Sequence, residues 1–181
     1  MERCFWCNLK NPLYVRYHDE EWGRVQLDDR YLFEMLLLES FQAGLSWECV
    51  LNKREAFRIA FDGFDVDKVS KYGKEKIDSL CQNKGIIRNR AKISATVGNA
   101  VVFKQIIAEY GSFFEYLKAF WDGKIVYDSN SVSSPLSDAI SNDLKRRGMR
   151  FVGTVIVYSF LQAVGIINSH TQNCFLYEAK I

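Results

Sequence analysis

The sequence has little of what marks a secreted, membrane-spanning or disulfide-bonded protein. No segment approaches the run of roughly 18 apolar residues that a membrane-spanning helix needs. Charged residues Glu2 and Arg3 open the chain and no apolar run follows them, which excludes a secretory signal. Five cysteines at irregular spacing favour thiols or metal ligands in a reducing compartment over a disulfide framework. We therefore expect a cytoplasmic protein with no membrane partner.

Net charge and strand patterns are also scarce. The formal net charge of the 181 residues is only +2, which neither requires nor excludes a nucleic-acid partner and favours a monomer. Hydrophobicity nowhere alternates with a period of two over the length of a strand. Apolar residues make up 48% and aromatic residues 14%, enough for a large core with rings left to line a ligand site. We expect an all-α fold.

The clearest helix lies in the stretch from Asp28 to Trp47. Asp28 or Asp29 can cap its start, and residues 31–38 are nearly all apolar, which predicts a helix buried in the core. Glu39 ends this run, where an ionised carboxylate is costly unless it is paired or hydrogen-bonded. Glutamates are mostly exposed in proteins, which favours a side chain that points to water. The alternative is a carboxylate at the floor of a pocket.

Periodicity and capping residues predict further helices at residues 46–61, 65–71, 74–83, 87–110, 113–121, 137–147 and 154–164. Residues 1–27 show no periodic pattern, but their many aromatic side chains argue against a floppy tail. The polar residues 122–135 predict a mobile connector within one fold. At the start of the 87–110 helix, Arg88, Arg90 and Lys92 oppose the helix dipole, which indicates a solvated basic face or a negative group nearby.

The sequence has only two histidines. His18 follows Cys4 and Cys7 near the N-terminal end, and His170 precedes Cys174 near the C-terminal end. His170 and Cys174 are four residues apart, a spacing that places both on one helical face. Cys4 and Cys7 form a CxxC pair near the other end. Two tetrahedral zinc sets are allowed, Cys4-Cys7-His170-Cys174 and Cys4-His18-His170-Cys174, and unconnected core thiols and surface histidines are the alternative. Either set leaves no position for water, so the metal would be structural.

The segment LKRRGMRFVGTV, residues 144–155, is typical of a helix-hairpin-helix. Gly148 and Gly153 allow turns and close approach, and the amides at the start of the helix at Thr154 can hold a phosphate oxygen. Four cations surround this link: Lys145, Arg146, Arg147 and Arg150. This charge favours binding to a duplex backbone over an ordinary interhelical turn.

Five aromatic residues accompany Glu39 as candidates for a base pocket: Trp6, Tyr14, Tyr17, Trp22 and Trp47. Rings that sandwich a planar base, with one carboxylate reading its edge, suit an enzyme that flips a base out of DNA. The alternative is that most of these rings belong to the core.

Several blocks of the sequence together resemble the 3-methyladenine DNA glycosylase I family. They are MERCFW at 1–6, PLYVRYHDEEWG at 12–23, LFEMLLLESFQAGLSW at 32–47, GIIRNRAKI at 85–93 and LKRRGMRFVGTVIVYSFLQAVGIINSH at 144–170. The resemblance runs almost end to end and thins at 122–135. It implies a single glycosylase domain over residues 1–181 with a helix-hairpin-helix glycosylase architecture, in which structural zinc joins the N- and C-terminal segments. The implied activity is that of a monofunctional enzyme, which removes 3-methyladenine from alkylated double-stranded DNA by hydrolysis.

The resemblance also implies roles for particular residues. Its zinc ligands fall on Cys4, His18, His170 and Cys174, which leaves Cys7 out. Its pocket glutamate falls on Glu39, the implied catalytic group, and its stacking aromatics fall on Tyr17 and Trp47, with Tyr14 and Trp22 close by.

Many helix-hairpin-helix glycosylases carry a catalytic aspartate shortly after the second helix, where this sequence has Asn168. An amide cannot act as a carboxylate base. This difference supports the alternative of a non-catalytic helix-hairpin-helix DNA-binding protein. A further alternative, which depends on the shape of the pocket, is a glycosylase for another alkylated purine.

Overall fold

The computed structural model describes residues 1–177 of the chain. In chain order the described elements are α1 (Pro12–Glu20), α2 (Asp29–Gln42), α3 (Trp47–Leu51), α4 (Arg54–Ala60), the 3₁₀ turn η1 (Asp62–Phe64), α5 (Val66–Val69), α6 (Lys74–Gln82), α7 (Arg90–Tyr110), α8 (Phe113–Lys118), β1 (Val126–Tyr127), α9 (Pro135–Arg146), α10 (Thr154–Ala163) and β2 (Ile167–Asn168). The described part is therefore mainly helical, which confirms the predicted all-α class. None of its helices has the length and apolar character needed to cross a membrane. The single domain predicted over residues 1–181 extends four residues beyond the described part.

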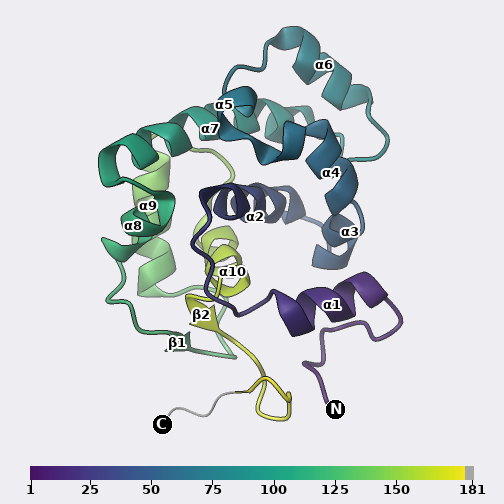
Figure 1. Cartoon of the computed structure of the whole chain (residues 1–181), viewed down its shortest axis with the longest axis vertical. Coiled ribbons are helices and arrows are strands. Elements are labelled where there is room, and N and C mark those ends of the chain that lie inside the picture. Colours follow the sequence, from purple (N-terminus) through teal and green to yellow (C-terminus); the bar gives the residue numbers. More distant parts are fainter. Residues whose placement is uncertain (178–181) are drawn as a thin grey trace.

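Helix α2 runs through the middle of the molecule (Figure 1). Its start is capped by Asp28, whose side chain accepts a hydrogen bond from the Tyr31 N–H. Residues 32–41 are all buried, and the helix packs against α10, α3, α7 and α8. The apolar run therefore forms a core helix, as predicted, and Glu39 lies in its last turn.

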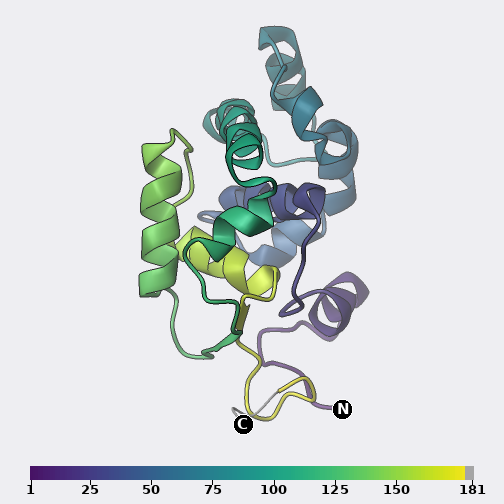
Figure 2. The same ribbon diagram turned by 60° about the vertical axis from the view of Figure 1, so that its left-hand side comes forward.

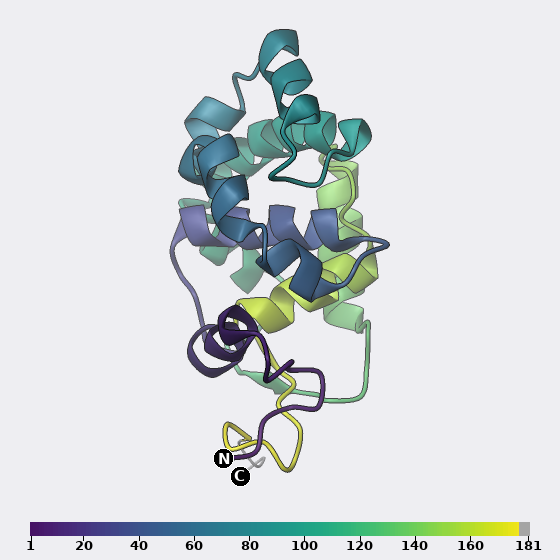
Figure 3. The same cartoon turned by 90° about the vertical axis from the view of Figure 1, so that its right-hand side faces the viewer.

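The other elements surround α2 on several sides. Helices α4 to α7 lie on one side of it, and α1, β1, β2 and both ends of the described chain lie on the other (Figure 1). Helix α9 stands beside α10 along one flank of the molecule (Figure 2). The two ends of the described chain meet at one end of the molecule (Figure 3). This arrangement brings the cysteine- and histidine-bearing segments together.

A close crossing of two chain segments fixes the N-terminal part against α10. Gly165 has φ of +79°, and a Cβ atom at this position would lie 2.1 Å from the carbonyl carbon of Arg24. The first segment donates two backbone hydrogen bonds to the second, from the Gly23 N–H to the Gln162 carbonyl and from the Gln26 N–H to the Val164 carbonyl, both at 3.1 Å. Only glycine fits this crossing, which holds the end of α1 beside the C-terminal segment.

The structure differs from the sequence-based expectation in three places. Residues 1–27 contain α1, whose N-cap is Asn11 and whose first residue is Pro12. The helix predicted over 46–61 is two helices separated at Asn52 and Lys53. The connector at 122–135 holds β1, which pairs in parallel with β2. These strands have two residues each, which is too short for an alternating pattern to appear in the sequence.

Candidate active site and metal site

A cavity of about 330 Å³ opens between α1, the C-terminal end of α2, the start of α3 and α10. Its lining residues are Phe5, Trp6, Tyr14, Tyr17, Trp22, Glu39, Gln42, Trp47, Ser129, Ser131, Val132, Val155, Tyr158, Ser159, Gln162, Ser169 and Thr171. The volume falls in the range of small-molecule sites. The structure therefore brings Glu39 and all five predicted aromatic residues to one pocket.

Glu39 supplies a buried carboxyl group to this pocket. Its side chain is 3% exposed, and its Oε2 atom has no hydrogen-bond partner among the described residues. Burial raises the pKa of the Glu39 carboxyl to about 8, because an ionised carboxylate there lacks the solvation that water provides. Glu39 is therefore buried in the lining of the pocket and does not point to water.

The rings of Tyr17 and Trp47 are in contact with each other beside Glu39. Their centroids are 5.3 Å apart and their planes are inclined by 46°. Two stacked contacts, one on each face of a planar ligand, need about 7 Å between the outer rings. The rings must therefore separate before a base can lie between them. Like the Glu39 carboxyl, the indole Nε1 of Trp47 is buried without a hydrogen-bond partner among the described residues.

Trp6, Tyr14 and Trp22 form one wall of the pocket. The Trp6 ring lies 5.3 Å from that of Tyr14 and 4.7 Å from that of Trp22, measured between centroids. On its other side Trp22 meets His170 edge-on at 4.7 Å. Burial raises the pKa of Tyr14 to about 12, so its hydroxyl stays protonated at neutral pH. These rings join the pocket to the cluster of cysteines and histidines behind it.

Cys4, His18, His170 and Cys174 form a buried cluster whose potential ligand atoms all lie within 4.8 Å of one another. The Cys174 Sγ is 3.4 Å from the His18 Nε2 and 3.5 Å from the His170 Nδ1, and the Cys4 Sγ is 3.5 Å from the same His170 atom. A tetrahedral zinc ion with bonds of about 2.0 to 2.3 Å places its sulfur and nitrogen ligands about 3.5 Å apart. The cluster therefore has the composition and spacing of a metal site.

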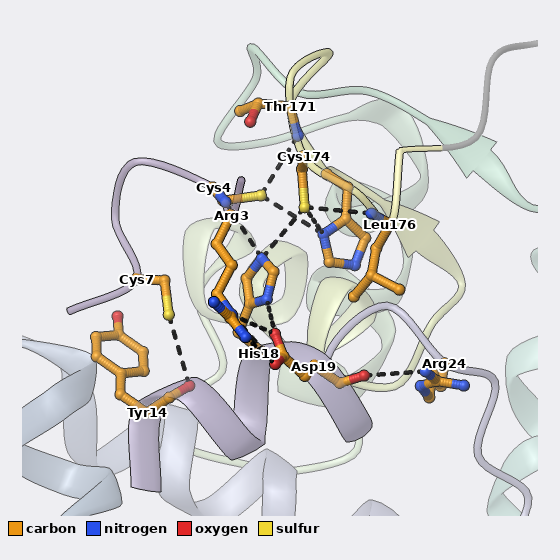
Figure 4. A network of polar contacts seen from close by, with 11 residues as sticks. Arg3, Cys4, Cys7, Tyr14, His18, Asp19, Arg24, Thr171, Cys174 and Leu176 are labelled. Atoms are coloured by element: carbon orange, nitrogen blue, oxygen red, sulfur yellow. Dashed lines mark hydrogen bonds and ion pairs between the residues drawn. The ribbon is translucent and has the colours of Figure 1, made fainter. Parts of the chain in front are cut away.

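Neighbouring polar residues orient the cluster (Figure 4). The His18 Nδ1 lies 2.7 Å from an Asp19 carboxylate oxygen, which turns the other ring nitrogen toward the two cysteines. Arg3 in turn donates to the same carboxylate at 2.7 to 3.1 Å. The Cys7 thiol points away and donates to the Tyr14 carbonyl at 3.8 Å, so the alternative ligand set that contains it is not assembled.

The predicted DNA-binding hairpin joins α9 to α10. Gly148 has φ of +104°, which glycine adopts without strain, and the backbone of Arg150 exchanges two hydrogen bonds of 2.9 Å with the buried side chain of Asn99. Gly153 is the N-cap of α10 and provides no side-chain cap, so it leaves the first amides of that helix without one. Lys145 is exposed. The link is thus held rigidly from the side of α7.

Two of the four predicted DNA-binding cations form ion pairs within the protein. Arg147 bonds to Asp143 at 2.7 Å and to Glu109 at 2.5 Å, and its guanidinium lies over the ring of Tyr110. Arg146 pairs with Asp143 as well. Lys145 and Arg150 are exposed and have no ion pair within residues 1–177. The exposed charge of the hairpin therefore resides mainly in these last two residues.

Asn168 has a structural role in β2. Its side-chain oxygen accepts a hydrogen bond from the His170 N–H at 3.1 Å, and its carbonyl accepts one from the Asp128 N–H at 3.0 Å. It is absent from the pocket lining.

Several pocket residues lie outside the predicted set, notably Tyr158 and Gln162 on α10 and Ser169 after β2. The Gln162 side chain donates to the Ser169 hydroxyl at 2.7 Å. Their positions depend on the crossing at Gly165, which the sequence pattern does not reveal.

Comparisons with known proteins identify the family of the chain. Residues 6–177 match the methyladenine glycosylase family. The chain is 43% identical to DNA-3-methyladenine glycosylase 1 of Escherichia coli (strain K12), with 99% of each protein covered. A crystal structure of 3-methyladenine DNA glycosylase I is 42% identical, with a TM-score of 0.92 and coverage of 98% of this chain and all of the other.

Another solved structure, a variant of 3-methyladenine DNA glycosylase I in complex with 3-methyladenine, is 35% identical, with a TM-score of 0.91 and coverage of 96% of both chains. The family match extends over nearly the whole described chain, and these relatives align from end to end. The chain therefore belongs to the methyladenine glycosylase family.

Proposed function

We propose that this protein is a DNA repair enzyme, a monofunctional DNA-3-methyladenine glycosylase that flips 3-methyladenine out of alkylated double-stranded DNA and hydrolyses its N-glycosidic bond. The observation that carries this proposal is the buried carboxyl of Glu39 in an aromatic pocket of base-binding size, in a chain of the methyladenine glycosylase family. A relative with the same fold holds 3-methyladenine. One glycosylase domain over residues 1–181, a monomeric state and a cytoplasmic location belong to the same proposal.

Recognition of the base depends on Glu39 and the rings around it. The carboxyl has an oxygen without a partner, so it can accept a hydrogen bond from the amino edge of an adenine. A cationic base beside Glu39 lowers the pKa of its carboxyl, so the carboxyl ionises when 3-methyladenine is bound. The ionised carboxylate repels the acceptor oxygen that a guanine presents at the corresponding edge. Tyr17 and Trp47 stack on the base, and a cationic base over an aromatic face gains about 1 to 2 kcal/mol when it is desolvated. Tyr14, Trp22 and Trp6 complete the pocket wall.

The chemistry needs little assistance beyond this binding. Methylation at N3 makes the adenine cationic, so the base leaves as a neutral molecule and its glycosidic bond is already labile. Asn168 cannot act as a carboxylate base, and its side chain is bonded to the backbone of His170. The protein therefore acts by extruding the nucleotide, holding the base against Glu39 and admitting water. Flipping costs a few kcal/mol, and the cost is lowest for a damaged base, which favours the lesion.

A zinc ion fits the cluster of Cys4, His18, His170 and Cys174. The cluster has two sulfur and two nitrogen donors with the spacing of a tetrahedral site, and Asp19 orients one of the histidines. Four protein ligands leave no position for a reacting water, so the ion would supply structural cross-linking and no chemistry. The cluster ties the N-terminal aromatic segment to the C-terminal segment beside the pocket.

DNA binding is assigned to the helix-hairpin-helix formed by α9, its link and α10. The exposed side chains of Lys145 and Arg150, with a smaller contribution from Arg146, neutralise phosphate charge. Gly148 and Gly153 let the backbone approach a phosphate. Arg147 takes part through the rigidity that its ion pairs give to the hairpin.

The experiment that tests this function is the release of free bases from methylated duplex DNA, separated by chromatography. We expect release of 3-methyladenine while 7-methylguanine stays in the DNA. Release of a different purine would favour a glycosylase of other specificity. Binding to duplex DNA without release of any base would favour the non-catalytic DNA-binding protein.

A further inference from the structure

Lys92 is a buried lysine without an acidic partner. Lys92 is 7% exposed, and it forms no ion pair within the described chain. The other two cations predicted at the start of α7 differ, because Arg90 pairs with Asp78 and Arg88 is exposed. A buried ammonium group that lacks a carboxylate needs other acceptors, and burial lowers the pKa of Lys92.

The acceptors are carbonyl groups at the end of α2. The Lys92 Nζ donates to the Phe41 carbonyl at 2.9 Å and to the Ala43 carbonyl at 2.8 Å. The last four carbonyls of a helix have no partner within the helix, and a cation at this end also interacts favourably with the helix dipole. Lys92 therefore ties the start of α7 to the C-terminal end of α2.

This contact holds a turn that is otherwise exposed. Residues 43–46, which connect α2 to α3, are all exposed. Within residues 1–177, side-chain hydrogen bonds to the backbone carbonyls of residues 41–46 come only from Lys92. The turn itself contains one backbone hydrogen bond, from the Leu45 N–H to the Gln42 carbonyl at 2.6 Å. Its position thus depends strongly on Lys92.

The same turn separates the two main groups of the base pocket. Glu39 lies just before the carbonyls that Lys92 binds, and Trp47 follows the turn as the first residue of α3. Gln42, between the two carbonyls, also lines the cavity. Any shift of the turn changes the separation of Glu39 and Trp47.

We propose that Lys92 is a positioning residue for base recognition: by binding the carbonyls of Phe41 and Ala43, it fixes the turn between Glu39 and Trp47 and so the positions from which these two residues meet a flipped base. The inference rests on the proposed function in that it takes the base as the ligand of this pocket. Lys92 itself does not line the pocket.

The test compares Lys92→Met with Lys53→Met. Lys53 is a matched control because its Nζ also links two elements through a carbonyl, that of Gly85 at 3.3 Å, and it does not line the pocket. Affinity for free 3-methyladenine is measured by calorimetry at a temperature at which every variant is folded. We expect Lys92→Met to bind about tenfold more weakly and Lys53→Met to bind within about twofold of the unmodified protein. Equal affinity of Lys92→Met and the unmodified protein would overturn the proposal.

Two further measurements guard against ambiguous results. Lys92→Gln retains a donor for one of the carbonyls and replaces Lys92→Met in the binding experiment if that variant does not fold. We expect its affinity for 3-methyladenine to be intermediate.

The indole NH resonance of Trp47, assigned with Trp47→Phe, reports the position of this ring in the absence of a ligand. It should shift in the Lys92 variants and stay in place in Lys53→Met. If the unmodified protein fails to bind 3-methyladenine, the proposed function fails, while an unshifted Trp47 signal would separately refute the role of Lys92.

Discussion

The Cys4 sulfur and the Nδ1 atom of His170 lie 3.5 Å apart, although 166 positions separate the two residues in the chain. A bond to one shared metal ion would close nearly the whole chain into a loop, and cross-links that close long loops restrict the unfolded state most. The N-terminal aromatic segment carries Trp6 into the pocket immediately after Cys4. Metal binding and the integrity of the pocket are therefore expected to depend on each other.

Metal content should distinguish the two ligand sets that the sequence allows. We expect the purified protein to hold one zinc ion per chain, Cys174→Ser to lose it and melt at a lower temperature, and Cys7→Ser to retain it. The reason is that the Cys7 thiol faces the Tyr14 carbonyl rather than the cluster. Atomic emission spectroscopy with thermal melts checks this. Loss of zinc in Cys7→Ser together with retention in Cys174→Ser would refute the assignment.

The pH dependence of stability should report the buried carboxyl of Glu39. Burial raises its pKa from 4.5 to about 8 in the folded protein, so between these values the unfolded chain releases a proton that the folded protein keeps. The free energy of unfolding should therefore fall as pH rises from 4.5 to 8, relative to Glu39→Gln, by up to about 1.4 kcal/mol per pH unit. Urea denaturation across this range measures the difference. A difference that does not change with pH would contradict the burial of an unpaired carboxyl.

Neighbouring cations of the hairpin should have separate effects. Lys145→Gln removes an exposed charge, so we expect weaker binding to duplex DNA and a decrease of about 1 in the slope of log affinity against log salt concentration. Arg147→Gln breaks ion pairs with Asp143 and Glu109, so we expect a lower melting temperature and a smaller change in the salt slope. Fluorescence anisotropy at several salt concentrations distinguishes the two. The reverse pattern would show that Arg147 reaches the DNA.

A buried ion-pair network joins α4 to α2 and to the residue that follows α1. Arg54 bonds to Glu34 at 2.5 Å and to Glu21 at 2.6 Å, and its side chain is 7% exposed. Arg54→Met leaves the buried Glu34 carboxylate with Arg58 as its remaining ion-pair partner and removes the ion pair of the part-exposed Glu21. We therefore expect a loss of about 3 kcal/mol in the free energy of unfolding, the lower end of the range for a broken buried ion pair. Arg58, which is more exposed and also bonds to Glu34, is the control, and Arg58→Met should cost about 1 kcal/mol or less. Equal losses in chemical denaturation would contradict this ranking.

The central helix and the position of its carboxyl group could be predicted because a single local sequence pattern specifies both. An apolar run from residue 31 to 38 with a capping aspartate specifies a buried helix, and Glu39 follows it directly. Helix α1 also has a signal, since Asn11 and Pro12 mark its start and the buried Tyr14, Tyr17 and His18 are three and four residues apart. With three buried positions, that helix is too short for its periodicity to stand out.

Other features depend on contacts between distant segments, which no local pattern encodes. Tyr158 and Ser169 reach the pocket because Gly165 lets the segment at Arg24 cross against α10. Arg147 belongs to a basic run, yet its charge is compensated by Glu109, which lies on a different helix. The contact between the rings of Tyr17 and Trp47 is likewise a property of the folded pocket.

The role of Glu39 is tested most directly by the affinity of free 3-methyladenine for the unmodified protein and for Glu39→Gln, measured by calorimetry together with the melting temperature of each. Glu39→Gln keeps the shape of the side chain but replaces its acceptor oxygen with an amide that also donates. We predict binding to the unmodified protein, at least about tenfold weaker binding to Glu39→Gln, corresponding to about 1.4 kcal/mol, and a melting temperature for the variant that is equal or higher. Unchanged affinity in Glu39→Gln would contradict the role of this carboxyl in recognising the base.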